Sequence, residues 1–451
     1  MFSARLALSL SRKGITMQTI EIKNIGPLKD TGLITITPVT LLIGEQSTGK
    51  STFMKILCFC CWLEKQVMIA GDSVLQKYTH YYRFINELKK FHHLDDSFFR
   101  ETSYIRYEGC AVLIELKGNK RKKSNARIVR KSGFAENKHN VKLSFLPSER
   151  NLLSSVQNIE SLYRAKDLDV LFNYILEWGE ARTQFDSLHP LDLVFSRGMK
   201  YNYDEKTGDV LTLEDGHSKI KPYYASSGVQ SALPVQVIAS YLAHEVGTSA
   251  KISPMEYLKQ VEANDTKIDV KVIAAVLREI AGRGGKALPK DLTEIFPTLG
   301  EVFEKMQSQS QYKSFHLFVE ELEQNLFPKA QFEMVRLLVT LLKQMKEKSP
   351  GFESSVFLTT HSPYVLTALN VMILASNAYS KNPQKVRDIG LENCVIGDNS
   401  FSAYCVRDGR LDSILEEEYH FIKGDFLDSI SDEVDDYTYA LNKIVYGNVE
   451  G

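Results

Sequence analysis

One glycine-bounded loop constrains the fold of this chain more than any other stretch. Residues 36–63 read ITPVTLLIGEQSTGKSTFMKILCFCCWL: an apolar strand at Val39–Ile43, a loop from Gly44 to Gly49, and an apolar helix. This order of strand, loop and helix is the setting in which G-x-x-x-x-G-K-[ST] forms a phosphate-binding loop. The sequence therefore predicts an α/β fold with a nucleotide site at the start of the helix.

The residues of this loop have the chemistry that a nucleotide phosphate requires. Glycines let the loop fold tightly, and backbone N–H groups in the loop and at the helix N-terminus point at anionic oxygens. Lys50 is expected to reach the terminal phosphates, and the Ser51 hydroxyl to ligate Mg²⁺. We expect the whole loop to bind the nucleotide, through Gly44, Glu45, Gln46, Ser47, Thr48, Gly49, Lys50, Ser51 and Thr52.

Composition favours a soluble globular protein. Of the 451 residues 43% are hydrophobic and 25% charged, and this length predicts two or three structural units. The net charge is −1, so any contact with nucleic acid must come from a local patch. The longest apolar run, residues 53–63, is interrupted by Lys55 and is too short to cross a bilayer, so we expect no membrane association.

Cysteine usage points to a reducing compartment. Three of the six cysteines lie on the apolar helix, and none shows disulfide or zinc spacing, so we expect reduced core residues and a cytoplasmic protein. Residues 1–16 are basic and lack acids, which leaves two interpretations open, a targeting segment and an N-terminal extension. Because Met17 opens the first strand, we expect either an over-long start of the sequence or a disordered extension.

Hydrophobic periodicity divides the rest of the chain into two parts of one domain with two helical insertions. Residues 152–185 have helical periodicity without a strand signal and are expected to form an inserted arm. The predicted units are residues 1–16 (extension), 17–150 (first part, with phosphate loop and a hairpin), 151–222 (helical insertion and return strands), 223–245 (a Ser-Ser-Gly motif and its helix), 246–311 (second helical insertion) and 312–451 (second part, with an acidic C-terminal segment).

The predicted hairpin at residues 117–131 is strongly basic. Eight positive charges with no acid among them could grip a DNA backbone, but a solvated hairpin end has the same composition, and both interpretations stay open. The charges belong to Lys117, Lys120, Arg121, Lys122, Lys123, Arg127, Arg130 and Lys131.

Polar residues follow two further apolar strands. The strand at residues 315–319 ends in Glu320 and Glu321, and the strand SSVFLTT ends in His361. A third motif, SSGVQ at residues 226–230, is expected just before a helix. Open α/β sheets bind ligands at the carboxyl ends of their strands, where these groups would meet the phosphate loop.

Taken in order, these motifs resemble the ATP-binding cassette (ABC) class of ATPases. The phosphate loop, SSGVQ, VEELEQNLFP at residues 319–328 and TTHSPYVLTALN at residues 359–370 are similar to the branch with SMC-like proteins and the ATPases of OLD-family, Gabija, Septu and PARIS defence systems. The resemblance covers the nucleotide-binding core and not the two insertions. It implies an ABC-type P-loop ATPase head with a mixed sheet and helical insertions.

The resemblance also implies roles for individual residues. Lys50 would bind the phosphates of ATP, with Glu320 at the metal position, Glu321 as general base and His361 as the switch that senses the terminal phosphate. These roles suit phosphoryl transfer, which needs a positioned water, a metal and charge neutralisation. The nucleotide of a second subunit would meet Ser226, Ser227, Gly228 and Gln230, so the chain would close around ATP as a homodimer or higher oligomer.

Several positions depart from the family pattern. Glu320 stands where Asp is common, Leu322 replaces Pro, Phe327 replaces His, and SSGVQ replaces LSGGQ. The Gln expected near residues 147–150 is absent, so Glu149 or Arg150 does its work, or the metal is held differently. Hydrolysis is therefore expected to be slow or dependent on a partner.

Three functions fit this resemblance. The first is an ATPase whose ATP-driven dimerisation controls a nucleic-acid-directed effector in a defence-like system. Only about 80 residues follow Asn370, and their second half, residues 412–436, holds many acids without the strand–helix alternation of a TOPRIM nuclease. A nuclease would therefore be a separate protein, as the resemblance to Septu and PARIS suggests. The second is an SMC-like DNA-bridging or repair ATPase, although residues 152–185 are short for a coiled arm. The third, a transporter ATPase subunit, fits poorly with the altered SSGVQ and the long insertions.

Overall fold

The fold was established from a computed structural model, which describes residues 18–70, 72–118, 125–137, 139–156, 159, 169–248, 312–397, 399–416 and 421–423. The predicted extension at residues 1–16, the tip of the basic hairpin, nearly all of the second insertion and most of the acidic C-terminal segment lie outside these residues. Among the described residues the chain has an α/β fold with mixed sheets and helices, so this predicted fold class is confirmed.

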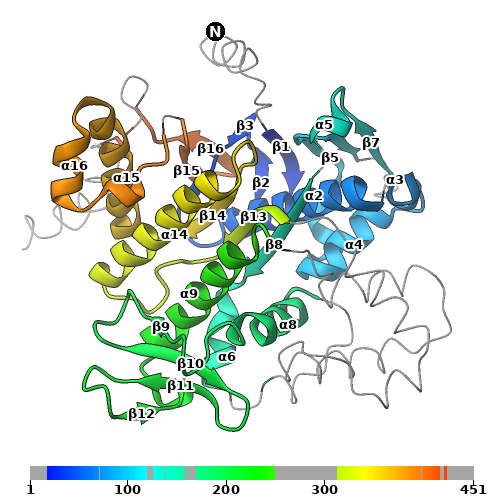
Figure 1. Cartoon of the computed structure of the whole chain (residues 1–451). Helices are drawn as coiled ribbons and strands as arrows, with labels where there is room; N and C mark the ends of the chain where they lie inside the picture. The colour runs from blue at the N-terminus through cyan, green and yellow to red at the C-terminus, as the bar shows by residue number, and fades with distance from the viewer. Residues whose placement is uncertain are drawn as a thin grey trace, which may run out of the picture.

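A six-stranded central sheet organises the molecule (Figure 1). Its five neighbouring strands from β15 to β8 are parallel, and β16 is antiparallel to β15 at one edge. The order is β16 (Arg410–Ser413), β15 (Phe401–Arg407), β4 (Val39–Ile43), β14 (Ser355–Thr360), β13 (Tyr312–Val319) and β8 (Asn140–Leu146).

The central strands are apolar because both faces of the sheet are covered. Every residue of β4 and of β14 is buried, as expected for strands inside a parallel sheet. Leu41 packs into the hydrophobic core on one face and Leu42 into the core on the other. The alternation shows that the phosphate-loop strand anchors both cores.

An antiparallel sheet and two helices cover the first face. The strands are β1 (Gln18–Ile25), β2 (Leu28–Asp30), β3 (Ile34–Ile36), β5 (Phe99–Glu108), β6 (Val112–Lys117) and β7 (Ala126–Arg130), and the helices are α2 (Lys50–Ala70) and α4 (Arg83–His92). Buried Glu64 of α2 accepts hydrogen bonds from the Tyr107 hydroxyl at 2.6 Å and from the backbone N–H of Ala111 at 2.7 Å. These contacts tie the phosphate-loop helix to the antiparallel sheet.

Helices cover the second face, which appears in green, yellow and orange in Figure 1. They are α8 (Val170–Arg182), α9 (Ser227–Glu245), α14 (Pro328–Lys348) and α15 (Pro363–Lys381). Pro328 and Pro363 occupy first helical positions, where a missing N–H has no cost, and Ser362 caps α15 through the N–H of Tyr364. Two helices therefore begin directly after the loops that follow β13 and β14.

Smaller elements complete the described part of the chain. A four-stranded antiparallel sheet contains β12 (Lys219–Ile220), β11 (Gly208–Thr212), β10 (Lys200–Asp204) and β9 (Leu191–Asp192). The short helices are α3 (Asp72–Thr79), α5 (Phe134–Asn137), α6 (Leu152–Ser155) and α16 (Pro383–Ile389), and the 3-10 turns are η1 (Asp96–Phe98), η2 (Ser148–Asn151), η3 (Pro222–Tyr224) and η4 (Glu392–Cys394).

Two local predictions are wrong. The predicted arm at residues 152–185 contains α8, which is packed in the core with Tyr174 and Trp178 each only 1% exposed. Its apolar residues gave a helical signal because they pack on α9 and β8. The SSGVQ motif does not precede its helix: Ser226 is the N-cap of α9, and Ser227 to Gln230 form its first turn.

The basic hairpin is present as the antiparallel pair β6 and β7. Its tip, residues 119–124, lies outside the described residues and holds four of the eight charges. Lys117 and Arg127 approach Glu115 at 3.3 and 3.9 Å, and Lys131 approaches Glu108 at 3.2 Å. Strand acids thus neutralise part of the charge on the stem.

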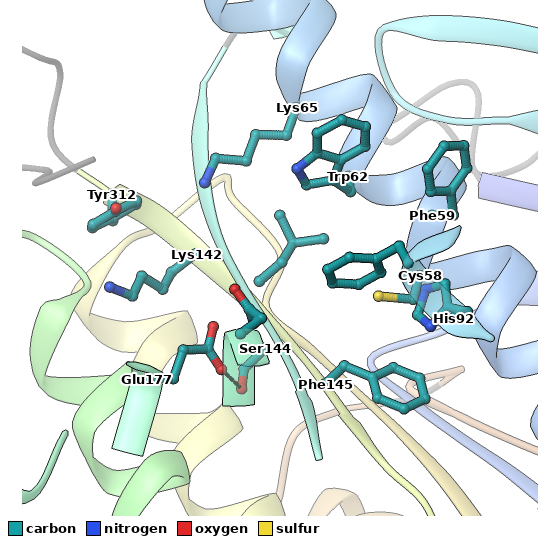
Figure 2. Close-up of a pocket in the computed structure, with 13 residues that line it drawn as sticks. Cys58, Phe59, Trp62, Lys65, His92, Lys142, Ser144, Phe145, Glu177 and Tyr312 are labelled. Atoms are coloured by element: carbon teal, nitrogen blue, oxygen red, sulfur yellow. Dashed lines mark hydrogen bonds between the residues drawn. The ribbon is translucent and has the colours of Figure 1, made fainter. Parts of the chain in front are cut away.

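A cavity of about 50 Å³, whose lining is more apolar than polar, lies between α2, α4, β8, α8 and Tyr312 of β13 (Figure 2). Burial raises the pKa of Glu177 to about 7, against the opposing hydrogen bond from Ser144 and the charge of Lys142. The Ser144 hydroxyl donates to Glu177 at 2.5 Å, and Lys142 donates to Tyr241 at 3.1 Å and approaches Glu180 at 3.4 Å. Ligand pockets usually measure ~300–1,000 Å³, so this cavity is too small for a nucleotide.

No helix among the described residues is long and apolar enough to cross a membrane. All six cysteines are free thiols, and five of them are buried.

Candidate nucleotide-binding site

The phosphate loop joins the carboxyl end of β4 to the first residue of α2. Gly49 has φ +114°, and a Cβ placed there would lie 2.7 Å from Leu28, so the position requires glycine. The Thr48 hydroxyl donates to the carbonyl of Glu45 at 2.9 Å, which closes the loop on itself. Glu45, Gln46, Ser47 and Ser51 are exposed, whereas Gly49, Lys50 and Thr52 are buried.

Lys50 lies beneath this loop. Its Nζ donates to the carbonyls of Gly44 at 2.7 Å and Glu45 at 2.6 Å. Burial lowers the pKa of Lys50 to about 8, although the carboxylates of Glu323 and Glu321 raise it in part. A phosphate anion in the loop would favour the charged ammonium, so the geometry suits an anionic ligand.

The carboxyl ends of three neighbouring strands bring the predicted catalytic residues together. Ile43 of β4 pairs with Thr360 of β14, so the phosphate loop and His361 leave the sheet side by side. Val319 of β13 pairs with Leu358 of β14, which places Glu320 at the same edge. Sequence patterns identified these groups, and the parallel register brings them together.

Glu320 is suited to holding a divalent cation. It is 3% exposed, and its Oε1 has no hydrogen-bond partner among the described residues, while Oε2 accepts from the Ser148 N–H at 3.4 Å. Burial raises the pKa of Glu320, and Lys55 and the Ser51 hydroxyl lower it in part. A buried carboxylate oxygen beside a serine hydroxyl fits Mg²⁺, which uses one or two carboxylates together with phosphate oxygens and waters. No larger cluster of metal-binding side chains occurs in the described chain.

The carboxylate of Glu321, unlike that of Glu320, is accessible. Its side chain is 41% exposed, and its Oε1 lies 4.0 Å from Nε2 of His361. Its backbone is left-handed, with φ +48°, which costs a residue with a Cβ about 1–2 kcal/mol. The Thr359 hydroxyl accepts from the Glu321 N–H at 2.9 Å and helps to hold this conformation. The turn therefore separates the two acids into one buried and one accessible carboxylate.

Glu323 is a site residue to which sequence reasoning assigned no role. Its carboxylate accepts from the Thr360 hydroxyl at 2.7 Å and from the His361 N–H at 2.6 Å. Among the acidic groups that raise the pKa of Lys50 against burial, Glu323 has the largest effect. The signal was visible as the third acid of EELE, but only the register shows that it holds the loop containing His361.

The SSGVQ turn packs on the loop that follows β13. A Cβ at Gly228 would lie 2.8 Å from the carbonyl oxygen of Asn325, which no real side chain tolerates, so this contact requires glycine. Nδ2 of Asn325 donates to the Ser231 hydroxyl at 3.0 Å, and Nε2 of Gln230 donates to the carbonyl of Tyr223 at 3.0 Å. Ser226 and Ser227 are exposed. Strands β13 and β14 separate this turn from the chain's own phosphate loop.

The predicted alternatives for the missing Gln are separated by the structure. Glu149 is exposed and accepts from the Ser148 hydroxyl at 3.2 Å, whereas Arg150 is completely buried. The three guanidinium nitrogens of Arg150 donate hydrogen bonds to main-chain carbonyls. Arg150 therefore does not present its charge to a metal.

Comparison with known proteins supports an ATPase domain. A family model described as AAA ATPase domain matches residues 293–366, less than half of the chain, and this stretch includes β13, the acidic strand end, α14, β14 and His361. No curated protein matches the sequence. The described site thus lies partly inside a stretch that is similar to AAA ATPases.

Two groups of solved structures show weak similarity. The SMC head domain from Thermotoga maritima is 11% identical, with 89% of this chain and 100% of that chain covered and a TM-score of 0.33. The recombination mediator protein RecF in its ATP-bound form is 12% identical, with coverage of 88% and 98% and a TM-score of 0.27. None of these comparisons points to PARIS, Septu or another defence system.

Proposed function

We propose that this chain binds and hydrolyses ATP with Mg²⁺ as an ABC-type ATPase that dimerises around the nucleotide. The observation that carries the proposal is the meeting of Lys50, Glu320, Glu321 and His361 at the carboxyl edge of three adjacent parallel strands. A phosphate loop beside a buried, incompletely bonded carboxylate is the arrangement that Mg²⁺ and a nucleoside triphosphate require.

Each carboxylate then has its own task. Glu320 and Ser51 would hold Mg²⁺, which neutralises charge on the phosphates as the bond to the leaving group breaks. Glu321 is accessible and would accept the proton of the attacking water. His361 lies beside Glu321 and would orient the terminal phosphate, while Lys50 would neutralise it.

A second copy of the chain would complete the site. Ser226 and Ser227 are exposed beside Gly228, which packs on the loop after β13, and two strands separate that loop from the chain's own phosphate loop, so these serines would meet the nucleotide of another molecule. Exposed aromatic side chains accompany the motifs: Tyr224 is 68% exposed, Phe327 77% and Tyr364 53%. Exposed aromatic residues beside functional groups are typical of surfaces that become buried in an interface.

ATP-driven closure would control a nucleic-acid-directed effector, for which a separate nuclease is the expected partner. The support is the basic hairpin, whose tip charges at residues 120–123 are available in sequence beyond a partly neutralised stem. An SMC-like DNA-bridging ATPase would use the same nucleotide site. Purification with the products of neighbouring genes separates the two, because only the first requires a co-eluting effector.

Lys50→Ala tests the site directly. It removes the charge expected to neutralise the terminal phosphates, so ATP binding should be lost in a calorimetric titration. Lys385→Ala is the matched control, because Lys385 is exposed on α16 and far along the chain from the loop. Equal ATP affinity for Lys50→Ala and the control would refute the assignment of the loop.

A further inference from the structure

The completely buried Arg150 joins the two halves of the proposed site. It lies in turn η2 directly after β8, and its three guanidinium nitrogens donate to three backbone carbonyls. Nε donates to Ser231 at 3.0 Å, Nη1 to Glu320 at 2.5 Å and Nη2 to Glu321 at 2.6 Å. The planar fork of arginine can make three such bonds at once, and lysine cannot.

The three acceptors belong to two elements with different tasks. Ser231 follows the SSGVQ turn of α9, which is placed to meet a partner's nucleotide. Glu320 and Glu321 carry the carboxylates that act on the chain's own nucleotide. The backbone of Arg150 is also anchored, because the Tyr174 hydroxyl of α8 donates to its carbonyl at 2.9 Å. The side chain of an anchored residue therefore bridges both elements.

The first turn of α9 lacks one backbone hydrogen bond to the next turn of its helix. Pro234 lies inside α9 and has no N–H to donate to the carbonyl of Gln230, one turn earlier. Ser231, which directly follows the turn, is bonded to Arg150 through its carbonyl and to Asn325 through its hydroxyl. The residue next to the turn is therefore tied directly to the acidic loop.

We propose that Arg150 is a positioning residue that couples the SSGVQ turn to the carboxylates of Glu320 and Glu321, so that engagement of a partner's nucleotide aligns the chain's own hydrolytic groups. The proposal rests on the proposed function and names a regulation of that site. Arg150 is buried and donates to main-chain carbonyls, so it would act by fixing the two peptide groups that orient the acids.

Arg150→Lys is the primary test, because it keeps the charge and loses the fork. ATP affinity should stay within about twofold of the wild type, since no phosphate-loop residue is altered. The maximal rate of hydrolysis should fall roughly 10²-fold, as expected when catalytic groups are misplaced by about 1 Å. Arg182→Lys is the control for losing a buried guanidinium, because Arg182 pairs with Asp209 at 3.4 Å away from the acidic loop. Arg150→Met, without any donor, should be slower still than Arg150→Lys.

Hydrogen exchange separates this proposal from the proposed function. Without nucleotide, the peptides covering residues 226–233 and 319–326 should have similar protection from hydrogen exchange to each other, both in the wild type and in Arg182→Lys. In Arg150→Lys both peptides should exchange faster, and their protection should differ. A wild type without ATPase activity would refute the proposed function, and the exchange data would still decide the coupling. Three results in Arg150→Lys would overturn the coupling. They are unchanged hydrogen exchange in both peptides, an unchanged rate of ATP hydrolysis, and a loss of ATP affinity as large as the loss of hydrolysis rate.

Discussion

Gly228→Ala is the sharpest probe of how the SSGVQ turn is held. The added Cβ would lie 2.8 Å from the Asn325 carbonyl oxygen, and ordinary contacts begin at 3.4 Å, so the two backbones must separate by 3.4 − 2.8, about 0.6 Å. Asn325 cannot yield freely, because it has φ +58° and donates to the Ser231 hydroxyl at 3.0 Å. Overpacking of this kind costs about 1–3 kcal/mol, which corresponds to roughly 5- to 150-fold in an equilibrium.

The expected result is a defect in closure with intact nucleotide binding. Gly228→Ala should bind ATP like the wild type, because the phosphate loop is two strands away. Its association in Mg²⁺-ATP should weaken by at most the factor above, because closure is opposed only by the part of the cost that the free subunit relieves by moving the turn. Size-exclusion chromatography with light scattering measures the association over a concentration series. Ser227→Ala is the control, since it removes a hydroxyl at the neighbouring position without adding an atom.

Two outcomes would refute this reasoning. If Gly228→Ala associates like the wild type, the turn is not locked against Asn325. If Gly228→Ala and Ser227→Ala lose association equally, side-chain contact with the nucleotide, rather than the packing of the turn, controls closure. Gly228→Glu would add a negative charge to the same clash, so the alanine variant is needed to separate packing from repulsion of the partner's phosphate.

Three further predictions concern catalysis, stability and DNA. Glu321→Gln should bind ATP and persist as the closed dimer with hydrolysis reduced ~10²-fold or more, because an amide cannot accept the proton; equal association by Glu321→Gln and Gly228→Glu in ATP would exclude a nucleotide sandwich. Because the folded-state pKa of Glu177 is raised from 4.5 to about 7, its contribution to stability is present below pH 4.5 and lost as pH rises to 7. Between pH 4.5 and 7, the free energy of unfolding in urea should therefore fall by up to about 3 kcal/mol less in Glu177→Gln than in the wild type. Identical dependence of the unfolding free energy on pH in the two proteins would contradict the raised pKa. Neutral replacement of the hairpin tip should weaken DNA binding and reduce the salt slope by roughly three to four, unless the wild type fails to bind DNA at about 50 mM salt; the replaced residues are Lys120, Arg121, Lys122 and Lys123.

The sequence predicted the elements that have local signals. The phosphate loop, the strand before Glu320 and the strand before His361 were recognisable because each is a short apolar run with a polar end. The sequence also predicted that these groups meet at one edge of a sheet, but the strand order and register were not recognisable, since β13, β14 and β4 are far apart in the chain and pair only in the fold. The role of Glu323, which depends on that pairing, was missed for this reason.

The errors have a physical cause as well. The helical periodicity of residues 152–185 could not tell a core helix from a projecting one, and the described helix α8 is buried along most of its length. Trp178 and Tyr174 decide the matter, because side chains of that size are buried only when neighbouring elements surround them. The expected role of Arg150 was wrong for a different reason. An arginine in a polar turn is usually expected to contact solvent or a ligand, and only its three carbonyl partners show that it bridges two parts of the fold.

The loop after β13 is where binding, catalysis and closure would meet. Within eight residues this loop contains the buried Glu320 at the proposed metal position and the accessible Glu321. In the same loop, Glu323 binds the backbone of His361, and Asn325 contacts the helix that begins with the SSGVQ turn. The left-handed conformation of Glu321 costs about 1–2 kcal/mol, and hydrogen bonds from its N–H to Thr359 and from Arg150 to its carbonyl stabilise it. Loss of either contact should therefore affect hydrolysis before it affects nucleotide binding.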